Sequence, residues 1–239
     1  MNNNFTPAQN TLAWLVHFFT ATGMVAGFMS LLAIADHNWR MAMFWLLVSQ
    51  VIDALDGTFA RWFRVKEVLP FFDGKMLDSV IDFANYAIIP AYFLYEAGMV
   101  SAPMSLPVAA AVLLTSGMYY GKSGMVSSDY HFVGFPVMWN FVIFYLFFVF
   151  NLGHTGNLLL FSAFCILHFV PVKYIYPTRT EEFWLLNTGI TVFTIVACAL
   201  LVYLYPKQTA TVTLLKVMAV AGLLYFGFMS VYKTYFYKA

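Results

Sequence analysis

Long apolar runs alternate with short polar breaks along the whole chain. Each run is close to the roughly 20 apolar residues that a membrane-crossing helix needs. The pattern predicts eight such helices, over residues 12–35, 39–61, 75–97, 103–122, 131–151, 156–176, 183–205 and 211–233. The breaks are too short to be linkers and no short-period repeat is visible, so we expect one all-α transmembrane domain over residues 1–239.

Composition strengthens this expectation. Hydrophobic residues make up 62% of the chain and charged residues only 10%, whereas globular domains carry roughly 25% charged residues. The formal net charge is +1, which provides no basic field for a nucleic acid partner. Cys165 and Cys198 both lie inside apolar runs, where we expect small buried side chains rather than a disulfide or a metal pair.

The positive charges predict how the helices are oriented, because Lys and Arg favour cytoplasmic loops. With a cytoplasmic N-terminus, nine of them fall on the cytoplasmic side: Arg61, Arg64, Lys66, Lys75, Lys122, Lys173, Arg179, Lys233 and Lys238. The opposite side receives Arg40 and Lys207, with Lys216 just inside the last helix. We therefore expect both termini on the cytoplasmic side.

Four aspartates lie where two of the expected helices approach that side. Asp53 and Asp56 fall near the end of the helix over 39–61, and Asp78 and Asp82 near the start of the helix over 75–97. One loop joins these helices, so the carboxylates are expected to converge. A charged residue costs on the order of 2.5–3.5 kcal/mol at the bilayer centre. Hard divalent cations would neutralise the cluster, since Mg²⁺ and Mn²⁺ favour oxygen ligands.

Small and basic residues accompany the aspartates. Gly57 follows Asp56, Gly74 begins the next helix, and Arg61 lies one turn beyond Gly57. Glycines allow close helix packing or leave room for a flat ligand, and an arginine can bind a phosphate. Because two-metal sites assist phosphoryl transfer, these residues predict a metal-dependent phosphotransfer site at the cytoplasmic surface.

The full pattern, D-x2-D-G-x2-A-R-x12-G-x3-D-x3-D from Asp53 to Asp82, resembles the signature of the CDP-alcohol phosphotransferases. These are integral membrane enzymes of phospholipid synthesis. The gap from Arg61 to Gly74 is longer than in most of the family and resembles the bacterial phosphatidylcholine synthase branch, which joins choline to CDP-diacylglycerol. The runs at 131–145 and 169–179 extend the resemblance. It implies a six-helix core followed by two further helices, a homodimer, and a place in the bacterial inner membrane.

The resemblance also assigns roles to the positions of the motif. It implies two ions, Mn²⁺ or Mg²⁺, held by Asp53, Asp56, Asp78 and Asp82. Asp82 is in addition the expected general base for the acceptor hydroxyl. The CDP pocket corresponds to Asp56, Gly57, Ala60, Arg61 and Gly74. Many relatives have an Asn-rich entry to the first helix, where this chain reads LVHFFTATG, so His17 or Thr20 is expected to face the nucleotide.

A choline acceptor would need aromatic faces and negative charge around its quaternary ammonium. The candidates near the expected depth of the aspartates are Asn85, Tyr86, Tyr119, Trp139 and Asn140. Aromatic residues form 20% of the chain, so an ordinary interfacial belt is the alternative. Lys173 and Arg179 are candidates for binding the phosphates of the lipid substrate or of membrane phospholipid, with simple interfacial anchoring as the alternative.

Two other functions compete with transfer to choline. The first keeps the reaction but uses serine, glycerol phosphate or inositol phosphate. Anionic acceptors should require basic residues in the membrane half of the site, where none is found, so the sequence favours a cationic or neutral acceptor. The second is a cation transporter with carboxylates near the middle of the membrane. All four aspartates lie toward one face, which favours an enzyme.

Overall fold

The computed structural model describes residues 5–176, 180 and 183–236. The first half contains α1 (Pro7–Ala35), α2 (Trp39–Trp62), α3 (Val65–Val68), α4 (Gly74–Phe83), the π-helix η1 (Ala84–Ile88), α5 (Ile89–Glu96) and α6 (Ala102–Tyr120). The second half contains β1 (His131–Val133), α7 (Trp139–Phe144), η2 (Tyr145–Phe150), α8 (Gly153–Leu167), β2 (Lys173–Ile175), α9 (Trp184–Leu204), α10 (Ala210–Val231) and η3 (Tyr232–Phe236).

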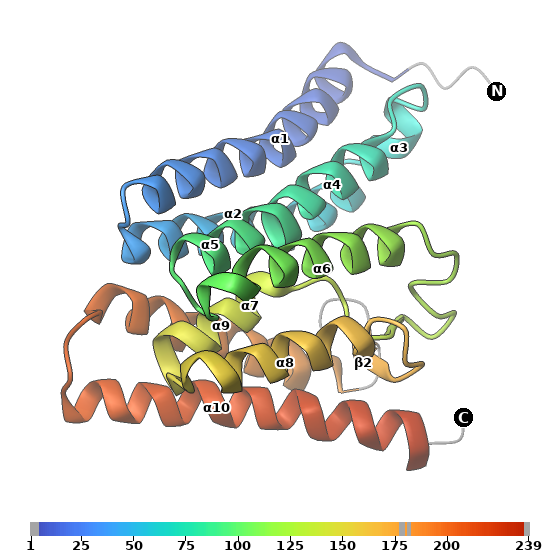
Figure 1. The fold of residues 1–239 in the computed structure, drawn as a ribbon. Coiled ribbons are helices and arrows are strands. Elements are labelled where there is room, and N and C mark those ends of the chain that lie inside the picture. Colours follow the sequence, from blue (N-terminus) through green and yellow to red (C-terminus); the bar gives the residue numbers. More distant parts are fainter. Residues whose placement is uncertain (1–4, 177–179, 181–182, 237–239) are drawn as a thin grey trace.

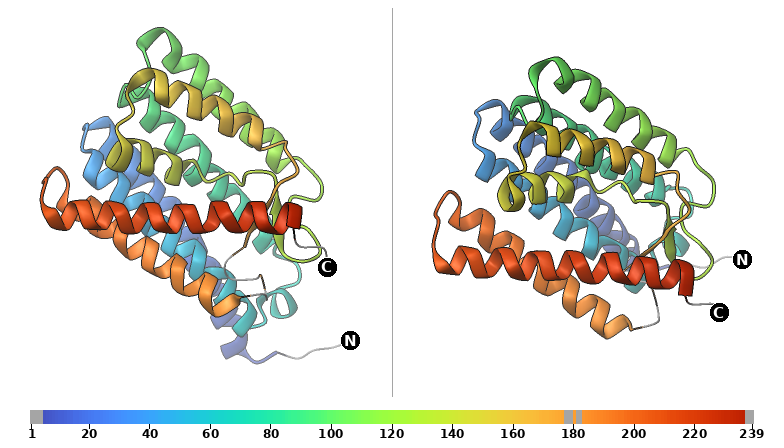
Figure 2. Two further views of the ribbon diagram at one scale, coloured as in Figure 1. Left: turned by 90° about the horizontal axis from the view of Figure 1, so that it is seen from below. Right: turned by 60° about the horizontal axis from the view of Figure 1, so that its bottom comes forward.

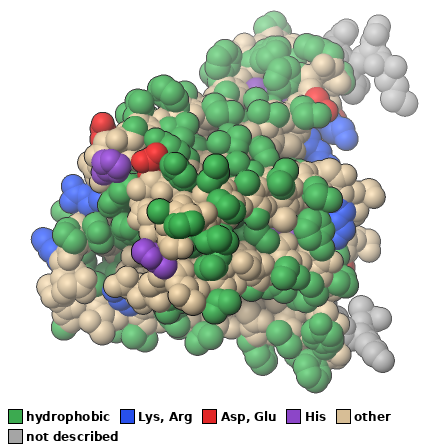
Figure 3. Space-filling view, in the orientation of Figure 1, with side chains coloured by type: hydrophobic (Ala, Val, Ile, Leu, Met, Phe, Trp, Pro, Cys, Tyr) green, Lys and Arg blue, Asp and Glu red, His purple; other side chains and the backbone are tan. Residues whose placement is uncertain are grey.

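Apolar helices dominate this fold, as the sequence predicts. In the described part of the chain, five helices are long and apolar enough to cross a membrane: Pro7–Ala35, Trp39–Trp62, Ala102–Tyr120, Trp184–Leu204 and Ala210–Phe236. Two shorter apolar helices cover Trp139–Phe150 and Gly153–Leu167. Hydrophobic side chains are spread over the face in Figure 3, while Lys and Arg lie toward its margins. The chain is therefore a mostly helical, multi-pass membrane protein.

The helices lie side by side, and successive long segments run in opposite directions (Figure 1). α1 packs along α2 and α4, while α9 and α10 form a second pair. Figure 2 shows α9 and α10 crossing the remaining helices on one side. The start of α1 and the end of α10 lie at the same end of the bundle, which agrees with two termini on one side of the membrane.

Local signals explain where the helices begin. Thr6 caps α1 by a capping box with Gln9, and Pro7 occupies the first turn, where its missing N–H costs nothing. The side chain of Asn38 accepts a hydrogen bond from the backbone N–H of Met41 at 3.2 Å and caps α2. Asp73 caps α4 in the same way, accepting from the N–H of Met76 at 3.0 Å. This cap fixes the start of the helix that carries Asp78 and Asp82.

The expected helices over 131–151 and 156–176 are wrong at one end each. Residues 131–133 and 173–175 form an antiparallel pair of strands, with His131 opposite Ile175. Gly134 adopts φ +90°, and a Cβ there would lie 2.1 Å from the carbonyl oxygen of His168. Pro136 and Pro171 also lack the N–H that a helix requires. Glycine and proline thus delay the start of the first helix to Trp139 and end the second at Leu167, so the fold is not purely helical.

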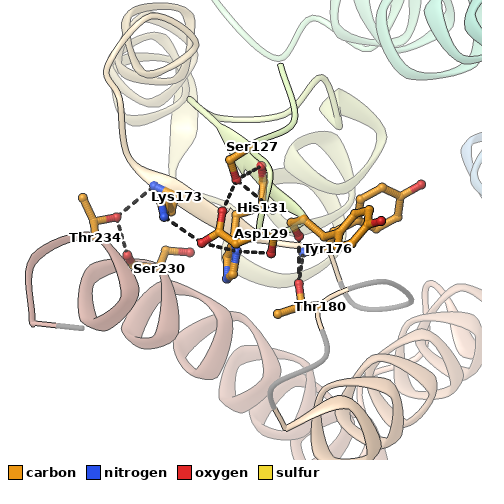
Figure 4. Close-up of polar contacts among 9 residues, drawn as sticks. Ser127, Asp129, His131, Lys173, Tyr176, Thr180, Ser230 and Thr234 are labelled. Atoms are coloured by element: carbon orange, nitrogen blue, oxygen red, sulfur yellow. Dashed lines mark hydrogen bonds and ion pairs between the residues drawn. The ribbon is translucent and has the colours of Figure 1, made fainter. Parts of the chain in front are cut away.

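Side chains join this small sheet to the end of the bundle (Figure 4). Lys173 Nζ lies 2.7 Å from Oδ2 of Asp129. The other carboxylate oxygen, Oδ1, accepts a hydrogen bond from Ser127 Oγ. The backbone N–H of Lys173 donates to Thr234 Oγ1 on η3 at 2.8 Å. The hydroxyl of Thr180 donates to the carbonyl of Tyr130 at 2.9 Å. The loop before α7 and the last helix are therefore connected through β2.

Candidate active site

Three of the four predicted aspartates come together between α2 and α4. Asp53, Asp78 and Asp82 each offer a carboxylate oxygen, and these oxygens lie within 4.8 Å of one another. All three residues are partly buried. Asp56 is more deeply buried, with 8% of its surface exposed, and is not in this group. Its carboxylate lies instead within hydrogen-bonding reach of the Thr20 hydroxyl on α1.

Two neutral side chains donate hydrogen bonds to Asp53. Tyr86 Oη lies 2.9 Å from Asp53 Oδ2, and Gln50 Nε2 lies 3.3 Å from the same oxygen. Tyr120, at the end of α6, has its hydroxyl near the carboxylate of Asp82. Gln50 was missed in the sequence, although a glutamine three residues before Asp53 in an apolar helix was a usable signal.

The helix that carries Asp78 and Asp82 widens directly after them. In η1, the N–H of Ile89 bonds the carbonyl of Ala84, five residues earlier. Pro90 follows and has no N–H to offer the carbonyl of Tyr86. The wider turn directs Tyr86 to α2, whereas its neighbour Asn85 faces α1. Such π-turns are frequent at functional sites.

The residues predicted to line the nucleotide pocket lie in the last turns of α2 and at the start of α4. Gly57 faces open space, since a Cβ there would meet only Arg61 Nη1, at 3.3 Å. Arg61 is exposed, and its Nη2 donates to Thr58 Oγ1 at 3.0 Å. Ala60 packs against a small apolar cluster of α1 and α3. These three positions follow Asp56 in the last turns of α2.

His17 lies directly against Gly74. A Cβ on Gly74 would be 2.7 Å from His17 Cε1, so the glycine is needed for this contact. The imidazole packs on Phe72 with ring centroids 4.3 Å apart, and its buried Nε2 has no hydrogen-bond partner among the described residues. The Thr20 hydroxyl donates to the carbonyl of Val16 at 3.2 Å, beside Asp56. Both alternatives for the nucleotide-facing residue of the first helix thus border the predicted pocket.

Two of the five choline candidates are connected to the aspartates. Tyr86 bonds Asp53 directly, and Asn140 Nδ2 donates to Gln50 Oε1 at 2.9 Å. The other three are bonded elsewhere. Asn85 Nδ2 donates to the carbonyl of Gly23 at 3.0 Å, and Trp139 Nε1 donates to Ser116 Oγ at 2.8 Å.

Tyr119 is the last of these candidates, and it is buried beside the sheet. Its hydroxyl lies 3.5 Å from the carbonyl of Gly134, and its ring lies 5.3 Å from that of His168. Trp139 has no exposed surface and packs against Phe161 in the same aromatic region. The hydrogen bonds of Tyr119 and Trp139 therefore go to Gly134 and Ser116 rather than to the aspartates.

Lys173, a candidate for binding lipid phosphates, forms the ion pair with Asp129 (Figure 4). The hydrogen bonds from Lys173 and Ser127 hold the pKa of Asp129 below its ordinary value. The Lys173 side chain remains 38% exposed, so its other N–H groups can reach solvent or lipid. Arg179, the second candidate, lies outside the described residues.

The carboxylates fit a divalent cation. Three of them within 4.8 Å supply several hard oxygen ligands around one point. The donors to Asp53 are a phenol and an amide, which leave its negative charge in place. Asp53, Asp78 and Asp82 are therefore suited to hold Mg²⁺ or Mn²⁺.

Comparison with known proteins links this geometry to a family. Residues 11–167 match the model of the CDP-alcohol phosphatidyltransferase family. A phosphatidylcholine synthase of Legionella pneumophila is 40% identical over 74% of this chain and 69% of its own length. One from Rhizobium meliloti is 38% identical over 79% and 78%, and one from Borreliella burgdorferi is 34% identical over 94% and 95%.

Proposed function

The chain belongs to the CDP-alcohol phosphatidyltransferase family, and we propose that it is a phosphatidylcholine synthase, which transfers the phosphatidyl group of CDP-diacylglycerol to choline and releases CMP. The observation that carries the choice of choline is the match to a phosphatidylcholine synthase along 94% of this chain and 95% of that relative. The group of aspartates between α2 and α4 supports the phosphotransfer chemistry.

The reaction exchanges one phosphorus–oxygen bond for another. The choline oxygen attacks the phosphorus that bears diacylglycerol, and the bond from this phosphorus to the oxygen of the CMP phosphate breaks. CMP leaves with the electron pair of that bond. Asp82 accepts the proton of the choline hydroxyl, which raises the nucleophilicity of the oxygen.

Asp53, Asp56, Asp78 and Asp82 are the residues proposed to hold the divalent ions. The family generally depends on divalent metals, and two ions, Mn²⁺ or Mg²⁺, would supply positive charge to the phosphates. The group formed by Asp53, Asp78 and Asp82 supports such a site. Asp56 joins the proposal because it lies one helical turn after Asp53 on α2.

The CDP moiety is proposed to bind along Asp56, Gly57, Ala60, Arg61 and Gly74. The open space beside Gly57 and the exposed guanidinium of Arg61 support this assignment. His17 supports it as well, because its Nε2, which has no partner in the described part of the chain, offers a hydrogen-bonding atom beside Gly74. For choline, the ring of Tyr86 and the negative charge around Asp53 supply the two features that a quaternary ammonium requires.

The proposal includes a topology. Eight membrane passes in one domain would put the aspartates and both termini on the cytoplasmic side of a bacterial inner membrane, because the basic residues concentrate at that end. The alternating directions of the helical segments in Figure 1 support an even number of passes. The family resemblance supports a homodimer, which cross-linking in native membranes would test.

An acceptor assay tests the proposed function. Purified protein is given radiolabelled CDP-diacylglycerol with Mn²⁺ or Mg²⁺, and choline, serine and glycerol phosphate are offered separately. We expect phosphatidylcholine and CMP with choline and no product in the presence of a chelator. Asp36→Asn serves as the control, because this exposed carboxylate lies at the end of α1 after its last turn.

Each other outcome has a defined meaning. Product with serine or glycerol phosphate alone would keep the family and replace the acceptor. Absence of CMP release with every acceptor would exclude the enzyme, and metal-dependent cation uptake into proteoliposomes would then favour the transporter.

A further inference from the structure

Gln50 has both ends of its amide bonded inside the membrane part of the protein. It lies on α2 one turn before Asp53 and is 8% exposed. Its Nε2 donates to Asp53 Oδ2 at 3.3 Å, and its Oε1 accepts from Asn140 Nδ2 at 2.9 Å. Asn140 belongs to α7, ninety residues further along the chain, and is 2% exposed. A buried chain of hydrogen bonds thus connects α7 to the carboxylate of Asp53.

The direction of this chain of hydrogen bonds follows from the chemistry of its end. An ionised carboxylate only accepts hydrogen bonds, so Gln50 must turn its amide nitrogen toward Asp53. Its oxygen then faces Asn140, and Asn140 must present its own nitrogen. Each amide therefore has one favoured orientation, which is set by the charge on Asp53.

Both donors of Asp53 meet the same oxygen. Tyr86 Oη and Gln50 Nε2 lie 2.9 and 3.3 Å from Oδ2. Two donors from different helices, η1 and α2, restrict rotation of the carboxylate about its terminal torsion. In the described part of the chain, Oδ1 has no donor, so it stays available to a cation shared with Asp78 and Asp82.

We propose that Gln50, held by Asn140, is a positioning residue that keeps the Asp53 carboxylate in the orientation in which it binds a divalent cation. This inference rests on the proposed function, since it assumes that Asp53 is a metal ligand. Hydrogen-bonded partners of metal ligands typically change metal affinity by 10–100-fold when they are replaced. Gln50 does not touch the substrate in this role.

The direct test is Mn²⁺ binding without substrate. The affinity of purified full-length protein in detergent micelles is measured from the electron paramagnetic resonance signal of free Mn²⁺. Gln50→Met keeps the length of the side chain and removes both hydrogen bonds. We expect its affinity for Mn²⁺ to fall by about 10–100-fold. Asn140→Leu should weaken Mn²⁺ binding in the same direction, by no more than Gln50→Met.

The double variant examines whether Asn140 acts through Gln50. If it does, Gln50→Met/Asn140→Leu should bind Mn²⁺ as weakly as Gln50→Met alone, because the contact to Asn140 is already lost. If the two losses of Mn²⁺ affinity multiply in the double variant instead, Asn140 does not act through Gln50. Asn157→Leu is the matched control, since Asn157 is a buried asparagine that donates to the carbonyl of Met99 at 2.7 Å. It should alter thermal stability and leave Mn²⁺ affinity unchanged.

The remaining outcomes separate this inference from the proposed function. Mn²⁺ affinity within twofold of wild type in both folded single variants would overturn the positioning role and leave the synthase proposal intact. If Gln50→Met does not fold, Asn140→Leu decides in the same way. Wild-type protein that binds no Mn²⁺ and forms no phosphatidylcholine would overturn both proposals.

Discussion

The imidazole of His17 and the missing side chain of Gly74 fit each other, because the ring occupies the space that a Cβ would need. This contact joins α1 to the start of α4, next to the predicted nucleotide pocket. Its aromatic neighbours are Phe72 and Trp14, with ring centroids 4.3 and 6.0 Å from that of His17. At the scale of single residues, the space beside the glycine of the motif is therefore filled by the imidazole of His17.

Gly74→Ala should lower thermal stability, because the new Cβ would lie 2.7 Å from His17 Cε1. Overpacking of this kind costs about 1–3 kcal/mol. Combining it with His17→Ala removes the clash, so the double variant should lose less stability than the sum of the two single changes. Thermal unfolding in detergent measures all four proteins. Strict additivity would contradict the contact.

Asp82→Asn should abolish turnover and leave binding of CDP-diacylglycerol measurable. The amide keeps the size of the side chain but cannot accept the choline proton, and loss of a general base typically costs about 10²–10⁴-fold in rate. CMP release and substrate binding are measured on the same preparation, with Asp36→Asn as the control. An active Asp82→Asn enzyme would remove Asp82 from the role of base.

Helical spacing and one short loop predict that carboxylates of two helices meet, but the prediction includes Asp56, which lies outside the group of Asp53, Asp78 and Asp82. The sequence does not predict the side chains that hydrogen-bond to these carboxylates. Gln50 and Asn140 are ninety positions apart, and their contact depends on how α2 and α7 pack. Hydropathy alone cannot supply that packing, since many apolar faces can meet in a membrane.

Between elements, a glycine on α1 lets the π-turn of η1 approach. A Cβ on Gly27 would lie 2.0 Å from Asn85 Oδ1 and 2.8 Å from Ile89 Cδ1. Asn85 also donates to the carbonyl of Gly23, one turn earlier on α1. Small residues at this spacing permit close helix packing in membranes, and here they hold the helix that carries Asp78 and Asp82 against α1.

Gly27→Ala should therefore be strongly unfavourable, with a loss of about 1–3 kcal/mol or more from overpacking. Gly189→Ala is the matched control on α9, because no heavy atom of the described residues lies within 4 Å of the added Cβ. That change should be neutral or stabilising, by about 0.5–1 kcal/mol, since glycine weakens a helix. Equal unfolding temperatures for the two variants would contradict the proposed packing.

The errors in predicting elements also have a physical cause. Residues 131–138 and 168–176 are apolar and aromatic, a composition that suits a strand or a membrane helix equally. What separates the two outcomes is local, namely Gly134 at φ +90° and the prolines that follow. The five long helices were predictable because length and hydropathy agree along their whole extent.

The sheet should make stability depend on acidity. Hydrogen bonds lower the pKa of Asp129 from 3.8 in the folded protein. The contribution of the ionised Asp129 to the free energy of unfolding is therefore complete above pH 3.8. It is lost as the pH falls through the lower pKa of the folded protein. Because the pair is partly exposed, Asp129→Asn should cost at most about 1 kcal/mol at neutral pH. The unfolding free energies of the wild type and of Asp129→Asn should become equal in acid. A difference between them that stays the same at every pH would contradict the ion pair of Asp129 as its cause.

For the whole molecule, the proposed orientation places the basic residues and the reaction at the same side of the membrane. The basic residues gather at the end where the aspartates lie, so CDP-diacylglycerol would be used from the cytoplasmic leaflet. Figure 3 shows few charged side chains away from the margins of the face it presents. The described ends of α1 and α10 lie together at one end of the bundle, as such an orientation requires.

Cysteine labelling measures this orientation in intact cells. Lys207→Cys, between α9 and α10, should react with a membrane-impermeant maleimide from outside. Lys66→Cys, on α3, should react only after the membrane is permeabilised. The native Cys165 and Cys198 are buried, so the background should be low. The reverse pattern would contradict the cytoplasmic position of the aspartates.

The pairing of β1 with β2 has a consequence for biosynthesis. His131 pairs with Ile175, and the N–H of Lys173 in turn bonds Thr234 near the end of the chain. A growing chain therefore makes β1 well before its partner strand, and the last helical turns arrive later still. The loop before α7 keeps an open strand edge at the membrane surface until residues 173–175 have been made. A chain shortened after residue 167, where the family match ends, would keep that edge open permanently.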